Sequence, residues 1–361
     1  MILANQDSVL FNFRKEVIKE IIYNGYDVII SSPYGKKIEY FKKLKCKFID
    51  TYINRRGINP FEDYKLFLTY LKIIKRYKPD IVLTYTSKCA IYGGMACRLT
   101  KTPYIVNNSG LIVLPKKLNF LKFFISFLYK LGDSKSNCMM YQNEYEMQII
   151  NNILKHRVKY KLIPGSGVNL DEFKYREYPD EKYGIIFNYV ARIMKGKGIE
   201  EYLKCAKIVH KKYPNTVFNI FGIYEDETYK SIIEKYELEG IVKYMGVYDD
   251  LRPFIEKAHA IIHPSYSEGM TNVCLEHSAM GRVCIASDIP GCREIIEDDR
   301  TGYVFQLKHV DKLVEKIEKF INLSNNEKKK MGQLARSKME KEFSRKFIGN
   351  TYINEINKIL K

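Results

Sequence analysis

Short apolar runs alternate with amphipathic segments along the first half of the chain. After the very short apolar start "MILA", Val17, Ile18, Ile21 and Ile22 recur at the spacing of one helix face, and Gly25 follows them. Apolar runs that predict strands follow over residues 26–33, 79–85 and 102–108, and helical patterns over residues 61–77 and 88–100. A strand followed each time by a helix is typical of a doubly wound parallel sheet.

The same alternation starts again after a turn-rich segment. Strands are expected over residues 185–193, 216–222, 241–246, 258–265 and 283–291, and helices over residues 198–212, 225–237, 250–257, 271–280 and from about 310 to the end. Two such α/β units, joined by a linker near residues 172–182, would face each other across a cleft. Ligands of such folds bind at the carboxyl ends of the strands. We therefore expect domains over residues 1–172 and 173–343.

Composition agrees with a two-domain globular protein and leaves the partner open. A chain of 361 residues exceeds the size at which one hydrophobic core stops growing, and 46% of its residues are hydrophobic. Lysine and arginine number 60 against 42 acidic residues, which gives a formal net charge of +18. This excess suits a polyanionic partner, such as nucleic acid, an anionic membrane face or a phosphorylated ligand. Ordinary lysine use on solvated faces is the alternative.

The cysteines and histidines give no indication of a metal site. The eight cysteines form no C-x-x-C pair, and most lie in apolar runs. Together with the lack of a signal peptide, they indicate a reducing cytosol. His259 and His263 flank a predicted strand without an acidic or cysteine partner in the pattern, so no metal is expected. No apolar stretch approaches the roughly 20 residues that span a bilayer.

Two carboxylates flank a predicted loop–helix junction in the second half. The stretch "SEGMTNVCLEHSAMG" places Glu268 on the loop and Glu276 in the first turns of the helix. At the helix start, the positive end of the helix dipole and the unpaired backbone N–H groups of Met270, Thr271 and Asn272 would form an anion site. Amides for phosphate beside carboxylates for hydroxyls suit a sugar nucleotide. An ordinary helix start with an exposed glutamate is the alternative.

A basic loop follows the first predicted strand of this half. Arg192 lies at the carboxyl end of the strand, and Lys195 and Lys197 follow in a glycine-bracketed loop before the next helix. A diphosphate suits such cations, because arginine binds two phosphate oxygens at once and lysine acts as a point charge. A solvated basic loop is the alternative.

The motifs of this half match those of a known family. Residues 263–305 contain a P-S-x-x-E-G stretch, a second glutamate, an apolar strand and a P-G-x-x-E segment; the matching positions are Pro264, Ser265, Glu268, Gly269, Glu276, Pro290, Gly291 and Glu294. An R-x-x-x-x-K-G element is present as Arg192, Lys197 and Gly198, and Gly222 ends the next strand. This pattern resembles the donor-binding core of glycosyltransferase family 4, retaining enzymes of the GT-B fold.

The resemblance implies a role for each of these residues. Glu268 would bind the hydroxyls of the donor sugar and Glu276 the ribose of the nucleotide. Arg192 and Lys197 would bind the diphosphate and offset the charge that develops on the leaving group, with no metal or other cofactor required. The donor site would be completed by Gly222, Gly269, Met270, Thr271 and Asn272.

The first half carries "LFNFRKEVIKEIIYNGYDV", "YQNEYE" and "IPGSGVNLDEF". These stretches resemble bacterial capsule and O-antigen enzymes and the N-acetylgalactosaminyltransferases that act on undecaprenyl-diphosphate sugars. The likeness implies an acceptor-binding domain over residues 1–172, with a helix over residues 344–361 packed back on it. Many members carry a histidine where this chain has Ser109 and Gly110, and the shortened first strand leads directly into Asn5. These three residues are the expected acceptor-side positions.

Residues 118–131 form an unusually apolar helical segment. The polar residues Asn119, Lys122, Ser126 and Lys130 make one narrow stripe along it, and lysines flank it. Such a helix would lie in a membrane interface, drawn by anionic lipid, or it would be buried between the sheet and its neighbours. A lipid-linked acceptor favours the membrane contact.

Together these features predict a retaining glycosyltransferase of two Rossmann-like α/β domains. It would move an N-acetylhexosamine or hexose from a UDP-sugar to a lipid-linked, undecaprenyl-diphosphate saccharide in capsule, exopolysaccharide or O-antigen synthesis. Its expected place is the cytoplasmic face of the cell membrane, as a peripheral protein. A nucleotide-sugar epimerase of the same fold is the alternative enzyme. A basic nucleic-acid-binding protein is the alternative from another class, although the lysine run over residues 326–332 has no interleaved aromatics.

Overall fold

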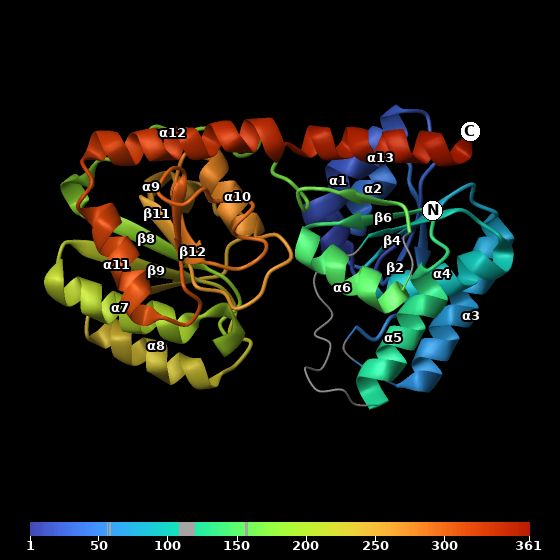
Figure 1. Cartoon of the computed structure of the whole chain (residues 1–361), viewed down its shortest axis with the longest axis horizontal. Helices are drawn as coiled ribbons and strands as arrows, with labels where there is room; N and C mark the ends of the chain where they lie inside the picture. The colour runs from blue at the N-terminus through green and yellow to red at the C-terminus, as the bar shows by residue number, and fades with distance from the viewer. Residues whose placement is uncertain (56, 58, 108–119, 156–157) are drawn as a thin grey trace. The chain divides into compact units, whose positions relative to one another are not determined.

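The computed structural model describes residues 1–55, 57, 59–107, 120–155 and 158–361, and this part of the chain forms two compact units (Figure 1). One unit comprises Met1–Gly167 together with Arg345–Lys361, and the other comprises Val168–Ser344. The second unit is therefore one continuous segment inserted into the first. The expected boundary at residue 172 lies a few residues inside the second unit, and the last helix belongs to the first.

The first unit is built on a parallel sheet, whose described strands lie in the order β3-β2-β1-β4-β5-β6-β7. These strands are β1 (Ile2–Leu3), β2 (Ile29–Ser32), β3 (Lys47–Asp50), β4 (Val82–Tyr85), β5 (Tyr104–Asn107), β6 (Cys138–Tyr141) and β7 (Tyr160–Leu162). The helices are α1 (Asp7–Tyr23), α2 (Ile38–Lys43), α3 (Pro60–Tyr77), α4 (Ser87–Thr100), α5 (Phe120–Asp133), α6 (Glu144–Leu154) and α13 (Arg345–Leu360). The sheet is doubly wound, as predicted, because the chain builds outwards from β1 in both directions.

The second unit repeats this plan with a parallel sheet in the order β10-β9-β8-β11-β12-β13. Its strands are β8 (Ile185–Val190), β9 (Thr216–Phe221), β10 (Lys243–Gly246), β11 (Ala260–His263), β12 (Val283–Ser287) and β13 (Gly302–Phe305). Its helices are α7 (Ile199–Lys212), α8 (Thr228–Leu238), α9 (Arg252–Lys257), α10 (Asn272–Ala279), α11 (Val310–Ile321) and α12 (Asn325–Glu342), with short 3-10 turns η1 (Glu181–Tyr183) and η2 (Lys195–Lys197). Strand β8 is central, so the loop that carries Arg192 leaves the middle of the sheet.

Each sheet separates two hydrophobic cores, because successive side chains of a strand point to opposite faces. In β12, Val283 and Ile285 pack with residues of α7, α8 and α11, whereas Cys284 and Ala286 pack with residues of α10 and α12. Figure 1 shows these two sets of helices on opposite sides of the sheet. In the first unit, α13 packs against α1.

Several elements of both units were not predicted, and the strands among them are β3, β6, β7 and β13. Strands β3 and β7 lie at the two edges of the sheet, and their residues are half-buried or exposed, so they lack the continuous apolar run of an inner strand. The helical tail predicted from residue 310 is in fact three helices. A capping box at Ser324 begins α12: its hydroxyl accepts a hydrogen bond from Glu327 N, and its backbone N–H donates to the Glu327 carboxylate.

Candidate functional site

The predicted donor residues gather at the carboxyl edge of the second sheet. Arg192 follows β8, Gly222 follows β9, and Glu268 lies on the loop between β11 and α10. Because these strands are parallel and β8 pairs directly with β9 and β11, their following loops meet at one edge. This arrangement brings Lys197 and Glu268 into contact across 71 residues of sequence.

The Lys197 ammonium and the Glu268 carboxylate form an ion pair in which Nζ lies 2.6 Å from Oε1. Both side chains are largely buried, with 20% and 15% of their surfaces exposed, so water screens the pair only partly. Backbone contacts hold the two loops together: Tyr266 N–H donates to the Gly196 carbonyl at 3.0 Å. The Tyr189 hydroxyl donates to the Lys197 carbonyl at 3.1 Å. The pair is therefore set in a rigid frame.

His263 also lies at this site, which the sequence pattern did not reveal. Its Nε2 lies 3.0 Å from Glu268 Oε1 and 3.3 Å from the Thr271 hydroxyl, and the ring is buried at the end of β11. The expectation that His263 has no acidic partner was therefore wrong. The loop after β11 turns back over the strand end and places Glu268 beside it. A P-S-x-x-E motif directly after a histidine was the available signal.

The charge state of Glu268 follows from these contacts. Burial would raise the pKa of the Glu268 carboxyl, but the hydrogen bond and charge of His263, together with the charge of Lys197, outweigh burial and lower the pKa from 4.5 to about 2. Glu268 is thus a carboxylate at neutral pH. A fixed carboxylate accepts hydrogen bonds and suits hydroxyl groups.

The start of α10 differs from the predicted anion site at one of its three amides. Thr271 N–H donates to the Gly291 carbonyl at 3.2 Å, so this amide is already engaged. The expectation that all three amides are unpaired was therefore wrong, because the loop after β12 folds back onto the helix start. Gly291 N–H in turn donates to the Glu294 carboxylate at 2.6 Å, which holds that loop in place. The side-chain Oδ1 of Asn272 is buried and has no hydrogen-bond partner among the described residues.

The remaining predicted donor residues lie on the same edge or on α10. Arg192 is half exposed, and its guanidinium lies 3.5 Å from the Glu225 carboxylate. Glu276 is half-buried on α10, one turn beyond Asn272. Gly222 has a backbone role: a Cβ there would stand 1.8 Å from the Ala191 carbonyl oxygen. Glycine therefore lets the segments after β8 and β9 lie close together.

An apolar surface next to these cations was also missed in the sequence. Ile223 lies two residues after β9 and Val247 directly follows β10, and more than half of each residue is exposed. Tyr248 is exposed too, and its ring packs against Phe254 with centroids 4.4 Å apart. The glycines that end both strands, followed at once by exposed apolar residues, were the available signal.

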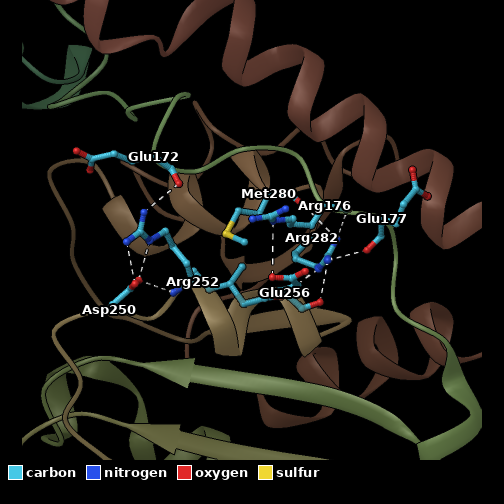
Figure 2. A network of polar contacts seen from close by, with 9 residues as sticks. Glu172, Arg176, Glu177, Asp250, Arg252, Glu256, Met280 and Arg282 are labelled. Carbon is cyan, nitrogen blue, oxygen red and sulfur yellow. Dashed lines mark hydrogen bonds and ion pairs between the residues drawn. The ribbon is translucent and has the colours of Figure 1, made fainter.

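Behind the site, Arg282 stabilises the far end of α10 (Figure 2). This arginine is completely buried, and its guanidinium donates to backbone carbonyls of three separate segments; the acceptors are Arg176, Glu177, Ile255, Glu256, Met280 and Gly281. A cation at the ends of α9 and α10 also complements their dipoles. Burial lowers the pKa of Arg282 to about 10, which leaves it charged at neutral pH. It fixes the helix that carries Glu276.

The acceptor-side residues are only partly described. Asn5 lies two residues after β1, and its Oδ1 is buried without a hydrogen-bond partner among the described residues. Ser109 and Gly110 lie outside the described residues. Asn107, at the end of β5, donates to the Thr84 carbonyl at 3.0 Å and accepts a hydrogen bond from Tyr352 of α13. Polar groups therefore line the carboxyl edge of this sheet as well.

Helix α5 overlaps the apolar segment at residues 118–131, of which residues 118 and 119 lie outside the described residues, and it is neither fully buried nor fully exposed. Tyr129 packs into the core, whereas Phe123 is 73% exposed and Phe127 47% exposed. These two phenylalanines are four residues apart and therefore share one face. Among the helices of the described ranges, none has the length and apolar character needed to cross a membrane.

In the described part of the chain, no group of three or more His, Cys, Asp and Glu side chains is placed to hold a metal ion. All eight cysteines are buried free thiols. His259 has a structural contact, since its Nδ1 accepts the Ile186 N–H at 3.0 Å.

Family models match both halves of the chain. The model "Glycosyl transferases group 1" matches residues 171–338, and the model "Glycosyl transferase 4-like" matches residues 1–143. Together they cover both sheets except for β7.

Relatives of known activity are similar over most of the chain. One is the N,N'-diacetylbacillosaminyl-diphospho-undecaprenol alpha-1,3-N-acetylgalactosaminyltransferase of Campylobacter jejuni, 25% identical over 87% of this chain and 87% of its own length. Another is the UDP-Gal:alpha-D-GlcNAc-diphosphoundecaprenol alpha-1,3-galactosyltransferase of Escherichia coli, 24% identical over 79% and 77%. A crystal structure of a glycosyltransferase from Rickettsia africae superimposes with a TM-score of 0.83 at 21% identity, over 100% of this chain and 98% of its own. These relatives are transferases and give no support to the epimerase alternative.

Proposed function

The protein is a glycosyltransferase of the GT-B fold, with a glycosyl transferase 4-like domain and an inserted group 1 domain, and we propose that it transfers a sugar from a UDP-sugar to a lipid-linked saccharide with retention. The sugar is an N-acetylhexosamine or a hexose, and the acceptor is carried on undecaprenyl diphosphate. The reaction belongs to capsule, exopolysaccharide or O-antigen synthesis. The names of the two relatives support this donor and acceptor chemistry.

One observation carries the proposal: a carboxylate that is charged at neutral pH and a cation lie side by side at the carboxyl edge of the second sheet. Glu268 Oε1 lies 2.6 Å from Lys197 Nζ, and Arg192 leaves the neighbouring strand. The donor has the complementary groups, a sugar rich in hydroxyls joined to a diphosphate. Glu268 would bind the sugar, and the two cations would stabilise the diphosphate as it leaves, as fixed charges do in a partly dehydrated site.

The rest of the nucleotide would extend from this centre. Glu276 on α10 would bind the ribose hydroxyls, and the start of α10 at Met270 and Asn272 would contribute amide groups to phosphate. Tyr248 offers an exposed ring at the same edge, which suits stacking on a base. No metal ion is required for this arrangement, because Arg192 and Lys197 supply the positive charge.

The first unit would bind the acceptor at the carboxyl edge of its own sheet. Asn5 follows β1 there, and Ser109 and Gly110 follow β5 in the sequence. The exposed phenylalanine face of α5, with lysines along it, would contact the anionic cytoplasmic face of the membrane, where a lipid-linked acceptor resides. The net charge of +18 agrees with such partners and does not require nucleic acid.

A donor screen tests the proposal. UDP release is measured from a panel of nucleotide sugars with membrane extract as acceptor, and one UDP-sugar should stand out. Glu268→Ala should lower turnover at least about a hundredfold while the protein stays folded by circular dichroism. Glu239→Ala, which removes an exposed glutamate paired with Lys207, is the control and should keep full activity. Wild-type turnover in Glu268→Ala would refute the site, and an isomerised UDP-sugar formed without acceptor would refute transfer.

A further inference from the structure

One oxygen of Glu268 receives two donors, and these differ in how firmly they are held. Lys197 Nζ lies 2.6 Å from Oε1, and His263 Nε2 lies 3.0 Å from the same oxygen. The ammonium ends a flexible four-carbon stem. The imidazole belongs to β11, is buried, and also contacts the Thr271 hydroxyl. Glu268 can therefore give up Lys197 and keep His263.

The backbone around Lys197 is fixed, although its ammonium is not. The Tyr189 hydroxyl holds the Lys197 carbonyl, and Tyr266 N–H holds the carbonyl of Gly196. Lys197 can therefore reach a new partner only by rotation of its side chain. A diphosphate at this edge would meet an ammonium that already holds a carboxylate.

We propose that Glu268 and the donor diphosphate compete for Lys197, and that His263 is the positioning residue that keeps the Glu268 carboxylate in place for the donor sugar once the diphosphate has taken the ammonium. This inference rests on the proposed function, because it takes the donor to be a nucleoside diphosphate sugar. Two anions that share one ammonium repel each other, so nucleotide binding is weaker than the cations alone would provide. The exchange leaves acceptor capacity on Glu268 for sugar hydroxyls.

Calorimetry with UDP tests the competition. Glu268→Gln removes the competing charge and keeps the size of the side chain, so UDP should bind this variant about threefold to tenfold more tightly than the wild type. Lys197→Met should weaken UDP binding, and adding Glu268→Gln to it should bring no gain, because the shared cation is gone. Glu239→Gln is the matched control. Glu239 pairs with Lys207 at 2.9 Å near the amino edge of the sheet, so the same loss of charge there should leave affinity within about twofold.

The outcomes separate this inference from the proposed function. Equal or weaker UDP binding by Glu268→Gln would overturn the competition. A gain of the same size in Glu239→Gln, or on the Lys197→Met background, would overturn it too, because the effect would then be one of net charge. If UDP fails to bind the wild-type chain at all, the proposed function itself fails.

Steady-state transfer tests the role of His263. His263→Leu removes the Nε2 donor, and His263→Gln offers an amide donor at a similar reach. In His263→Leu, kcat should fall at least about tenfold while UDP affinity changes less than about threefold, and His263→Gln should recover most of the loss. Both variants are assayed at a temperature well below their unfolding midpoints. A merely structural role for His263 would lower both midpoints without making the two kcat values differ. Wild-type kcat in His263→Leu, or an equal loss in both variants, would overturn the assignment.

Discussion

Gly198 lies against the carbonyl group of Pro264, so closely that a Cβ at residue 198 would stand 2.0 Å from the carbonyl oxygen. The φ of Gly198, +74°, lies in the left-handed region, which residues other than glycine rarely adopt. The contact joins the loop after β8 to the loop after β11. It thereby sets how near Lys197 comes to Glu268.

The first prediction concerns this contact. Gly198→Ala should weaken UDP binding at least about tenfold and destabilise the protein by about 1–3 kcal/mol, because the loop must move away from Pro264 to admit the methyl group. Calorimetry and urea unfolding measure the two effects. Gly196→Ala is the matched control two residues earlier, where a Cβ would meet only Met194 Cε at 3.7 Å. If both variants bind UDP equally well, the contact does not set the site.

The second prediction is a pH dependence of stability due to Glu268. Its pKa is lowered from 4.5 to about 2 in the folded chain, so the folded state binds this proton less tightly than the unfolded state does. The stabilisation is fully present above pH 4.5 and is lost as the pH falls towards 2, and it amounts to about 3 kcal/mol.

Urea unfolding of the wild type and of Glu268→Gln across this pH range measures the effect, because the other carboxylates are common to both proteins. The free energy of unfolding should fall more steeply with acid in the wild type. Parallel curves would show that His263 and Lys197 do not stabilise the charged form.

The third prediction concerns Arg282. Arg282→Met should destabilise the protein by about 3 kcal/mol or more, because several buried carbonyls lose their donor at once. Thermal or urea unfolding reports the change. Arg252→Met is the control from the same region (Figure 2): Arg252 pairs with Asp250 at 2.8 Å on the surface, and its loss should cost less than about 1 kcal/mol. Similar costs for the two variants would argue against the buried network.

The fourth prediction concerns the exposed face of α5. The double variant Phe123→Glu/Phe127→Glu should float with anionic liposomes far less than the wild type, since it replaces two exposed apolar rings by charges that the lipid repels. Tyr23→Glu is the control, because Tyr23 is an 88% exposed aromatic residue on α1. Equal flotation of the folded double variant would exclude α5 as the membrane contact.

Much of the fold was predictable because inner strands of a parallel sheet are continuous apolar runs. The strands from β8 to β12 and the helices that follow them were found in this way, with ends shifted by a few residues. Strands β3 and β7 were not, because an edge strand has one solvated side and its pattern resembles a loop. Tertiary pairing, rather than local pattern, makes these two segments strands.

The candidate site was predictable in its residues and less so in its contacts. Motif spacing marked Glu268 and Lys197, and the parallel sheet implied that their loops meet. The hydrogen bond from His263 to Glu268 depends on how the loop after β11 turns, and the engaged amide of Thr271 depends on the loop after β12. Neither turn has a local sequence signal that separates it from an open loop.

The two places where the chain passes between the units lie next to each other. Val168 forms a β-bridge with Ser344, and on the other side Arg345 donates to the Gly167 carbonyl at 3.2 Å. The chain therefore enters and leaves the inserted unit at adjacent positions. Residues 168–344 can then be exchanged between related chains by two joins that leave the surrounding sheet uninterrupted. Under the proposed function, recombination at these joins would change the donor and keep the acceptor. A chimaera assayed with both parental donors would show whether donor choice follows the inserted unit.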